Sequence, residues 1–260
     1  MYKIIDTHSH LFVEEFGDDR AEVMLRAQEA GVQRILMPNI DLASVEPMLR
    51  VCAEYPGYCH PMIGLHPTEV NVGYREPLAQ MKAMLDADPQ RYVAIGEVGL
   101  DLYWDKTYKQ EQIAALEEQI AWALEYDLPL VIHSREAFDD IYALFSRYKD
   151  TSLRGVFHSF TGTADEAHAL LEFPGFLLGI NGVVTFKKAT LPDALRDVPL
   201  SRLVVETDSP YLAPTPYRGK RNESAYVVRV VEKLAEIYGL APEAIAEQTY
   251  ANAMALFRLD

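Results

Sequence analysis

Cysteine is scarce in this 260-residue sequence, which contains only Cys52 and Cys59. Two cysteines without a CxxC spacing are too few for a disulfide framework and are typical of a reducing compartment. No window approaches 18 consecutive apolar residues, so we expect no membrane span. The first apolar run begins at Ile4, which leaves no room for a signal peptide. We therefore expect a cytoplasmic protein.

Basic residues are also in short supply, with 24 Lys and Arg against 39 Asp and Glu, for a net charge of −15. Affinity for a nucleic-acid duplex comes largely from cations that neutralise phosphates. The balance therefore disfavours a general duplex-binding protein. A small or chain-end phosphate substrate stays open, because bound metal ions can supply positive charge locally.

Glycine-rich phosphate loops and linker segments are absent, and the remaining pattern alternates short apolar runs with helix-like stretches. Eight strands are expected to begin near Lys3, Gln33, Tyr58, Tyr92, Leu130, Gly155, Phe176 and Arg202. Eight such alternations favour an α/β fold of the (β/α)8 TIM-barrel type, with an open doubly wound sheet as the alternative. We expect a single domain over residues 1–260, with an extra C-terminal helix over Pro242–Phe257.

Two histidines, His8 and His10, end the first expected strand in Asp6-Thr7-His8-Ser9-His10. Side chains of a strand alternate between its faces, so Asp6, His8 and His10 are expected on one face. Two imidazoles at one strand end are well placed to bind a metal ion. An isolated H-x-H pattern also fits two structural histidines, so further ligands are needed to decide.

Further ligand-type residues end other expected strands. Glu97 ends the fourth, His133 the fifth, His158 the sixth and Asp208 the eighth. Such groups are costly after apolar runs unless they are paired or bind metal. In a barrel these strand ends converge on the face that carries active sites. Four imidazoles and two carboxylates exceed the needs of one zinc ion and predict two divalent ions of the Zn, Mg, Mn or Ni class.

Other residues are expected around this centre. His66, in Gly64-Leu65-His66-Pro67, is a candidate for substrate binding or proton transfer, or else caps the following turn. Glu206 lies two residues before Asp208 and is expected to orient an imidazole or a water. The densest basic run contains Arg218, Lys220 and Arg221, which are candidates for binding substrate phosphate. A solvated surface run is the alternative for these three residues.

Six motifs together resemble those of the TatD family of metal-dependent hydrolases. They are Asp6-Thr7-His8-Ser9-His10, Gly64-Leu65-His66-Pro67, Gly96-Glu97-Val98-Gly99-Leu100-Asp101, Ile132-His133-Ser134-Arg135, His158-Ser159-Phe160-Thr161-Gly162 and Glu206-Thr207-Asp208-Ser209-Pro210-Tyr211-Leu212. The resemblance implies a barrel, divalent metals and deoxyribonuclease-type phosphodiesterase activity. It also implies six metal ligands, of which Glu97 bridges both ions and Asp208 joins it in catalysis: His8, His10, Glu97, His133, His158 and Asp208.

The expected substrate is DNA, as single strands or strand ends, or another phosphodiester. Two other functions remain open: an amide or ester hydrolase that uses the same centre, and a non-enzymatic metal-binding scaffold. No obligate protein partner is evident.

Overall fold

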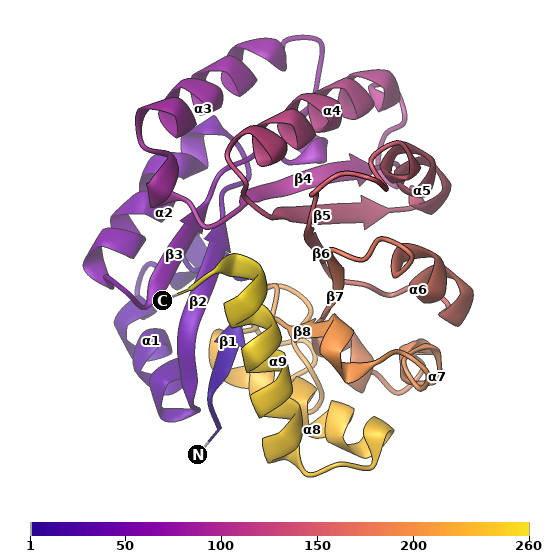
Figure 1. Ribbon diagram of the computed structural model, residues 1–260. Coiled ribbons are helices and arrows are strands. Elements are labelled where there is room, and N and C mark those ends of the chain that lie inside the picture. Colours follow the sequence, from indigo (N-terminus) through magenta and orange to yellow (C-terminus); the bar gives the residue numbers. More distant parts are fainter. Residues whose placement is uncertain (1, 260) are drawn as a thin grey trace.

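The computed structural model describes residues 2–259, in which parallel strands alternate with helices (Figure 1). The strands are β1 (Ile4–Asp6), β2 (Val32–Pro38), β3 (Cys59–Met62), β4 (Ile95–Asp101), β5 (Leu130–Arg135), β6 (Gly155–Phe157), β7 (Phe176–Ile180) and β8 (Leu203–Val205). The helices are α1 (Arg20–Glu29), α2 (Leu42–Glu54), α3 (Arg75–Ala87), α4 (Lys109–Glu125), α5 (Phe138–Ser146), α6 (Ala164–Leu170), α7 (Leu191–Ala194), α8 (Val227–Tyr238) and α9 (Pro242–Phe257).

The strands close into a ring. Neighbours pair in parallel in the orders β1-β2-β3 and β4-β5-β6-β7-β8. Between β3 and β4, the amide of Ile63 donates to the carbonyl of Ala94 at 3.2 Å. Between β8 and β1, the amide of Thr7 donates to the carbonyl of Val205 at 3.2 Å. The fold is therefore the predicted (β/α)8 barrel, and the open-sheet alternative is wrong.

An apolar layer fills the barrel interior below the carboxyl ends of the strands. Each strand, or the residue just before it, contributes one side chain to this layer. The layer consists of Ile5, Leu36, Met62, Ala94, Val131, Val156, Leu177 and Val204. Helix α9 lies across β1 and β8 (Figure 1) and buries Ala253, Leu256 and Phe257 against this layer. The predicted extra helix thus closes the barrel at the end opposite to the carboxyl ends of the strands. Burial of this apolar surface stabilises the closed end.

The fourth strand begins at Ile95, three residues later than predicted. Before this strand, Pro89–Arg91 forms a short 3-10 turn, which a proline at its first position favours. Cys52 and Cys59 are both buried and free, as expected from their spacing. Within residues 2–259, every helix is too short or too polar to cross a bilayer.

Candidate metal centre

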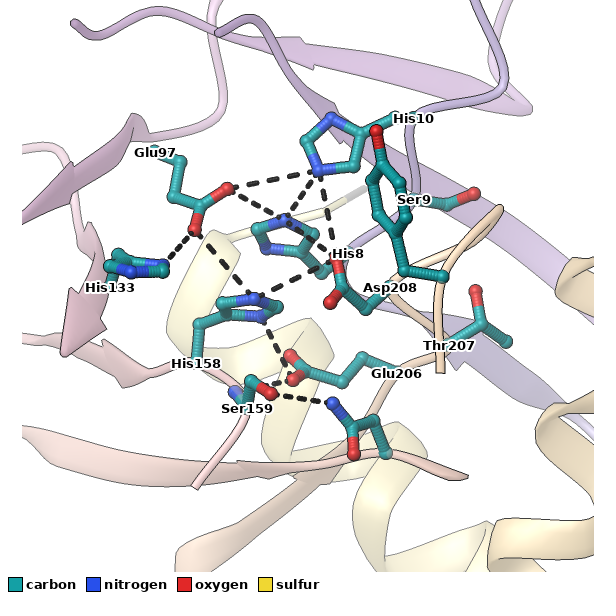
Figure 2. A network of polar contacts seen from close by, with 12 residues as sticks. His8, Ser9, His10, Glu97, His133, His158, Ser159, Glu206, Thr207 and Asp208 are labelled. Atoms are coloured by element: carbon teal, nitrogen blue, oxygen red, sulfur yellow. Dashed lines mark hydrogen bonds and ion pairs between the residues drawn. The ribbon is translucent and has the colours of Figure 1, made fainter. Parts of the chain in front are cut away.

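The segment after β1 carries the first two histidines. The structure ends β1 at Asp6, so the prediction that His8 and His10 end this strand is wrong. Beyond this point the amide of Ser9 still donates to the carbonyl of Leu36 in β2 at 3.1 Å, and Ser9 pairs with Ser209 beyond the end of β8. The segment stays extended, and the Nε2 atoms of His8 and His10 lie 3.1 Å apart (Figure 2). Both rings are buried.

Glu97 lies between two sets of histidines. Its Oε2 is 3.1 Å from Nε2 of His8 and 3.7 Å from Nε2 of His10. Its Oε1 is 2.9 Å from Nδ1 of His133 and 3.7 Å from Nε2 of His158 (Figure 2). Glu97 is the third residue of β4, and not its last as predicted, because the strand continues to Asp101. The pairing of β4 with β5 is irregular between Ile95 and Val98, the stretch that contains Glu97.

Each of the two opposing histidines is held by a carboxylate on its far side. Nε2 of His133 lies 2.9 Å from Oδ2 of Asp101, at the end of β4. Nδ1 of His158 lies 2.9 Å from Oε1 of Glu206, as the predicted orienting role for Glu206 requires. A β-carbon on Gly179 would lie only 2.5 Å from Oε2 of Glu206, so glycine leaves the room that this carboxylate occupies. The orienting role of Asp101 was not predicted from the sequence, because its contact with His133 depends on the pairing of β4 with β5.

Asp208 completes the centre from the side of β8. Its Oδ1 lies 3.8 Å from Nε2 of His8, 3.7 Å from that of His10 and 3.9 Å from that of His158. The residue has a left-handed backbone with φ of 58°. Aspartate tolerates this region better than most residues. The turn aims the carboxylate back into the barrel mouth.

His66 also reaches the centre. Its Nε2 lies 3.3 Å from Oε1 of Glu97, and its Nδ1 lies 2.7 Å from the hydroxyl of Thr68. The ring packs edge-on against His133 with 4.6 Å between centroids. Three overlapping groups of donor atoms, each within 4.8 Å of one another, could therefore hold metal: His8, His158 and Asp208; His8, His10 and Glu97; His66, Glu97 and His133.

The protonation of these groups is strongly coupled. Burial raises the pKa of the Glu97 carboxyl, but the surrounding imidazoles outweigh it and hold that pKa well below its usual range. Burial lowers the pKa of His158, yet Glu206 and Glu97 together raise it to about 10. Burial likewise opposes protonation of His133, and Asp101 and Glu97 raise its pKa to about 8. For His8, burial and repulsion from His158 lower the pKa.

The donor set fits divalent metal ions. Within residues 2–259, Glu97 and Asp208 have ion-pair contacts with histidines but none with Lys or Arg. Buried carboxylates need compensating charge, and imidazole with carboxylate is a favoured ligand combination for zinc and related ions. The Nδ1 atoms of His8 and His10 are buried without hydrogen-bond partners. The polar contacts of both rings are therefore made by Nε2, which faces Glu97 and Asp208.

The cations of the predicted basic run differ in whether they form an ion pair with an acidic side chain. Arg221 pairs with Asp19 through two contacts of 2.8 and 2.6 Å, so a substrate phosphate would have to compete with this carboxylate for the predicted binding by Arg221. The Arg218 guanidinium lies 3.8 Å from the centroid of Phe186. Within the described chain, Arg218 and Lys220 form no ion pair with an acidic side chain. Thr215, just before the basic run, donates its amide to the Thr185 hydroxyl at 2.8 Å. This contact ties the start of the run to the loop after β7.

Known proteins resemble this chain over nearly its whole length. Residues 5–258 match the family described as TatD related DNase. YabD of Bacillus subtilis, named an uncharacterized metal-dependent hydrolase, is 38% identical over 99% of this chain and 100% of its own. TatD of Erwinia billingiae, named a 3'-5' ssDNA/RNA exonuclease, is 32% identical over 98% of this chain and 99% of its own.

A crystal structure of YjjV, a TatD homologue from Escherichia coli, superposes on this barrel with a TM-score of 0.92. The two sequences are 30% identical, and the match covers 99% of this chain and 98% of YjjV. Barrel, donor set and sequence agree, and the chain belongs to the TatD family of metal-dependent hydrolases.

Proposed function

We propose that this hydrolase cleaves phosphodiester bonds in nucleic acid, with single strands or strand ends as its substrate. The observation that carries the proposal is the position of Glu97, whose two oxygens face separate sets of histidines. One carboxylate shared in this way suits two adjacent divalent ions, an arrangement that recurs in phosphatases and nucleases. The exonuclease name of the Erwinia relative supports the same substrate class.

We assign the ligands from the contacts. His8, His10 and Asp208 would hold one ion, His133 and His158 would hold the other, and Glu97 would offer one oxygen to each set. His66 lies next to Glu97 on the open side of the second set, where a substrate oxygen or a proton is within its reach. Ligand type and metal availability, and not affinity alone, decide the ions within the Zn, Mg, Mn or Ni class, because imidazole suits Zn and Ni whereas carboxylate suits Mg and Mn.

Divalent ions in such a centre supply Lewis acidity and a nucleophile at neutral pH. The chain's own residues position the reaction. Asp208 faces the mouth of the barrel and is placed to orient the attacking water or to accept its proton. Asp101 and Glu206 fix the orientation of His133 and His158. Arg218 and Lys220 lie in the segment after Asp208 and steady the phosphate as charge develops.

The test is a metal-resolved nuclease assay on one preparation of the full-length protein. Single-stranded DNA, single-stranded RNA, duplex DNA and a carbonyl ester are offered after loading with each candidate metal, with a chelated control. We expect metal-dependent cleavage of single strands that exceeds cleavage of duplex. Faster turnover of the carbonyl ester than of every phosphodiester would instead establish the amide or ester hydrolase. No turnover of any substrate at full metal loading would indicate the scaffold.

A further inference from the structure

Exposed aromatic side chains gather on one end of the barrel. Among the described residues three large aromatic side chains are exposed: Tyr103 at 48%, Trp104 at 72% and Tyr211 at 49%. Tyr103 and Trp104 follow β4, and Tyr211 follows β8, so all three lie on segments at the carboxyl ends of strands. Exposed apolar surface that gathers beside a functional centre marks a binding site.

Two of these rings form a platform with Arg135. The Tyr103 and Trp104 rings meet edge to face with 4.8 Å between centroids. The Arg135 guanidinium carbon lies 3.8 Å from the centroid of Tyr103 and 5.3 Å from that of Trp104. Within residues 2–259, Arg135 contacts these rings and forms no ion pair with a carboxylate. The platform of Tyr103, Trp104 and Arg135 therefore combines flat apolar faces with an unneutralised cation.

The platform is anchored to the metal centre. Arg135 is two residues beyond His133 on β5, a displacement of about 7 Å along the strand. In the pairing of β5 with β4, Arg135 lies opposite Asp101. Oδ1 of Asp101 accepts from the amide of Tyr103 at 3.1 Å, while Oδ2 contacts His133. The carboxylate that orients the histidine thus also fixes the start of the aromatic loop.

We propose that the platform binds a nucleobase of a single-stranded substrate next to the phosphate that is cleaved. This inference rests on the proposed function and adds to it a subsite and a reason for strand preference. An aromatic face and a guanidinium plane both stack on any base, whereas Arg135 also attracts the adjoining phosphate. A base within a duplex already stacks on its neighbours and must be extruded first. The site therefore favours unpaired strands without reading their sequence.

Intrinsic fluorescence gives a direct binding measurement. The chain contains two tryptophans, and Trp122 is buried within α4 at 3% exposure, so Trp104 is the ring that a ligand can reach. The full-length, metal-loaded protein is titrated with a short oligothymidylate whose phosphorothioate linkages resist hydrolysis. The comparison ligand is an abasic oligomer of the same length and charge. We expect the oligothymidylate to quench Trp104 and the abasic oligomer to bind about 5- to 100-fold more weakly.

Variants test whether the platform causes the difference. Tyr103→Ala and Trp104→Ala, followed by anisotropy of a labelled oligomer, should each weaken oligothymidylate binding about 5- to 100-fold and leave abasic binding unchanged. Leu240→Ala is the matched control, because Leu240 is 47% exposed in the turn between α8 and α9. Equal affinity of the two oligomers for the wild-type protein, or no effect of either platform variant, would overturn the inference.

Cleavage of ordinary oligomers separates this inference from the proposed function. If the platform variants raise KM for oligothymidylate but not for the abasic oligomer, both proposals stand. Quenching of Trp104 without cleavage by the metal-loaded protein would retain the platform and refute phosphodiester hydrolysis. Cleavage whose KM is the same in the wild type and in both variants would retain the hydrolysis and refute the platform.

Discussion

The two nitrogens of the His133 ring contact two different carboxylates: Nε2 lies 2.9 Å from Oδ2 of Asp101, and Nδ1 lies 2.9 Å from Oε1 of Glu97. When Asp101 accepts a hydrogen bond from the protonated Nε2, Nδ1 is left with its lone pair toward the centre. An outer carboxylate in this position fixes both the tautomer and the orientation of a ligand ring.

Asp101→Asn should lower metal affinity or activity by about 10- to 100-fold. The amide can donate to Nε2, which moves the ring proton to Nδ1 and removes the donor atom from the centre. Metal titration followed by the rate at saturating metal separates the two effects. Asp197→Asn, on the exposed surface before β8, is the matched control. An Asp101→Asn protein with wild-type affinity and rate would refute the orienting role.

Glu97→Gln should abolish turnover and preserve the fold. The substitution keeps the shape of a buried side chain but removes the negative charge that both histidine sets face. We expect a loss greater than the roughly 100-fold typical of residues that only support a ligand. Circular dichroism checks the fold, and Glu46→Gln on the exposed face of α2 is the control. An unchanged kcat at saturating metal would show that Glu97 does not contact the ions.

Much of this centre could be predicted because its residues follow apolar runs at regular intervals. The eight strand starts lie within about three residues of their expected positions, and parallel strands bring their carboxyl ends together. The expected alternation of side chains between the two faces of the strand failed at Asp6, however. The strand ends there, and the Asp6 carboxylate accepts from the amide and hydroxyl of Thr207 at 2.8 and 2.6 Å instead of facing the metal side with His8.

Contacts between residues far apart in the chain could not be predicted from the sequence, for a different reason. The engagement of Arg221 with Asp19 joins residues about 200 positions apart, and no local pattern reports it. The same holds for Asp101 and His133, which meet only because β4 and β5 pair in a register that brings Gly99 opposite His133. A β-carbon on Gly99, where φ is +148°, would lie 1.9 Å from the His133 carbonyl oxygen. Glycine is therefore required for this approach of the two strands.

Full metal loading should approach two ions per chain. The proposed ligands number six, and a single tetrahedral ion uses at most four of them. Elemental analysis after reconstitution and desalting gives the ratio, and activity is measured on the same sample. A plateau at one ion per chain with full activity would refute the two-ion arrangement.

Metal binding should release protons near neutral pH. In the metal-free protein the pKa of His133 is raised to about 8 and that of His158 to about 10. Both folded-state values exceed the unfolded value, so their contribution to stability is complete below about pH 6.5 and declines as pH rises through each of them. At pH 7 both rings carry a proton that a bound ion must displace.

Calorimetry in buffers with different ionisation enthalpies counts those protons. We expect about two released at pH 7 and about one at pH 9, with apparent metal affinity rising over that interval. The thermal midpoint of the metal-free protein should fall over the same range. Metal binding that is independent of pH and releases no proton would show that these two histidines are not ligands.

The salt dependence of binding should be shallow, because an acidic protein offers few cations to a polyanion. The net charge is −15, and the cations without acidic partners in residues 2–259 near the centre include Arg135, Arg218 and Lys220. Each phosphate contact on a single strand contributes roughly −0.7 to the logarithmic salt slope. Two or three contacts therefore predict a slope of about −1.4 to −2.1 for single-stranded oligomers.

Arg218→Ala and Lys220→Ala should each reduce the steepness of that slope by about 0.7 and raise KM, without loss of metal. Lys3→Ala provides the control, since Lys3 is exposed just before β1, at the opposite end of the barrel. A wild-type slope equivalent to about six phosphates or more, together with preference for internal duplex sites, would contradict local recognition. Such a result would require a continuous basic groove, whereas Arg135 ends β5 and Arg218 and Lys220 lie together in one segment after β8. The salt slope and the strand preference therefore test the same physical claim, that metal ions and a few side chains, and not a charged surface, bring the phosphate to the centre.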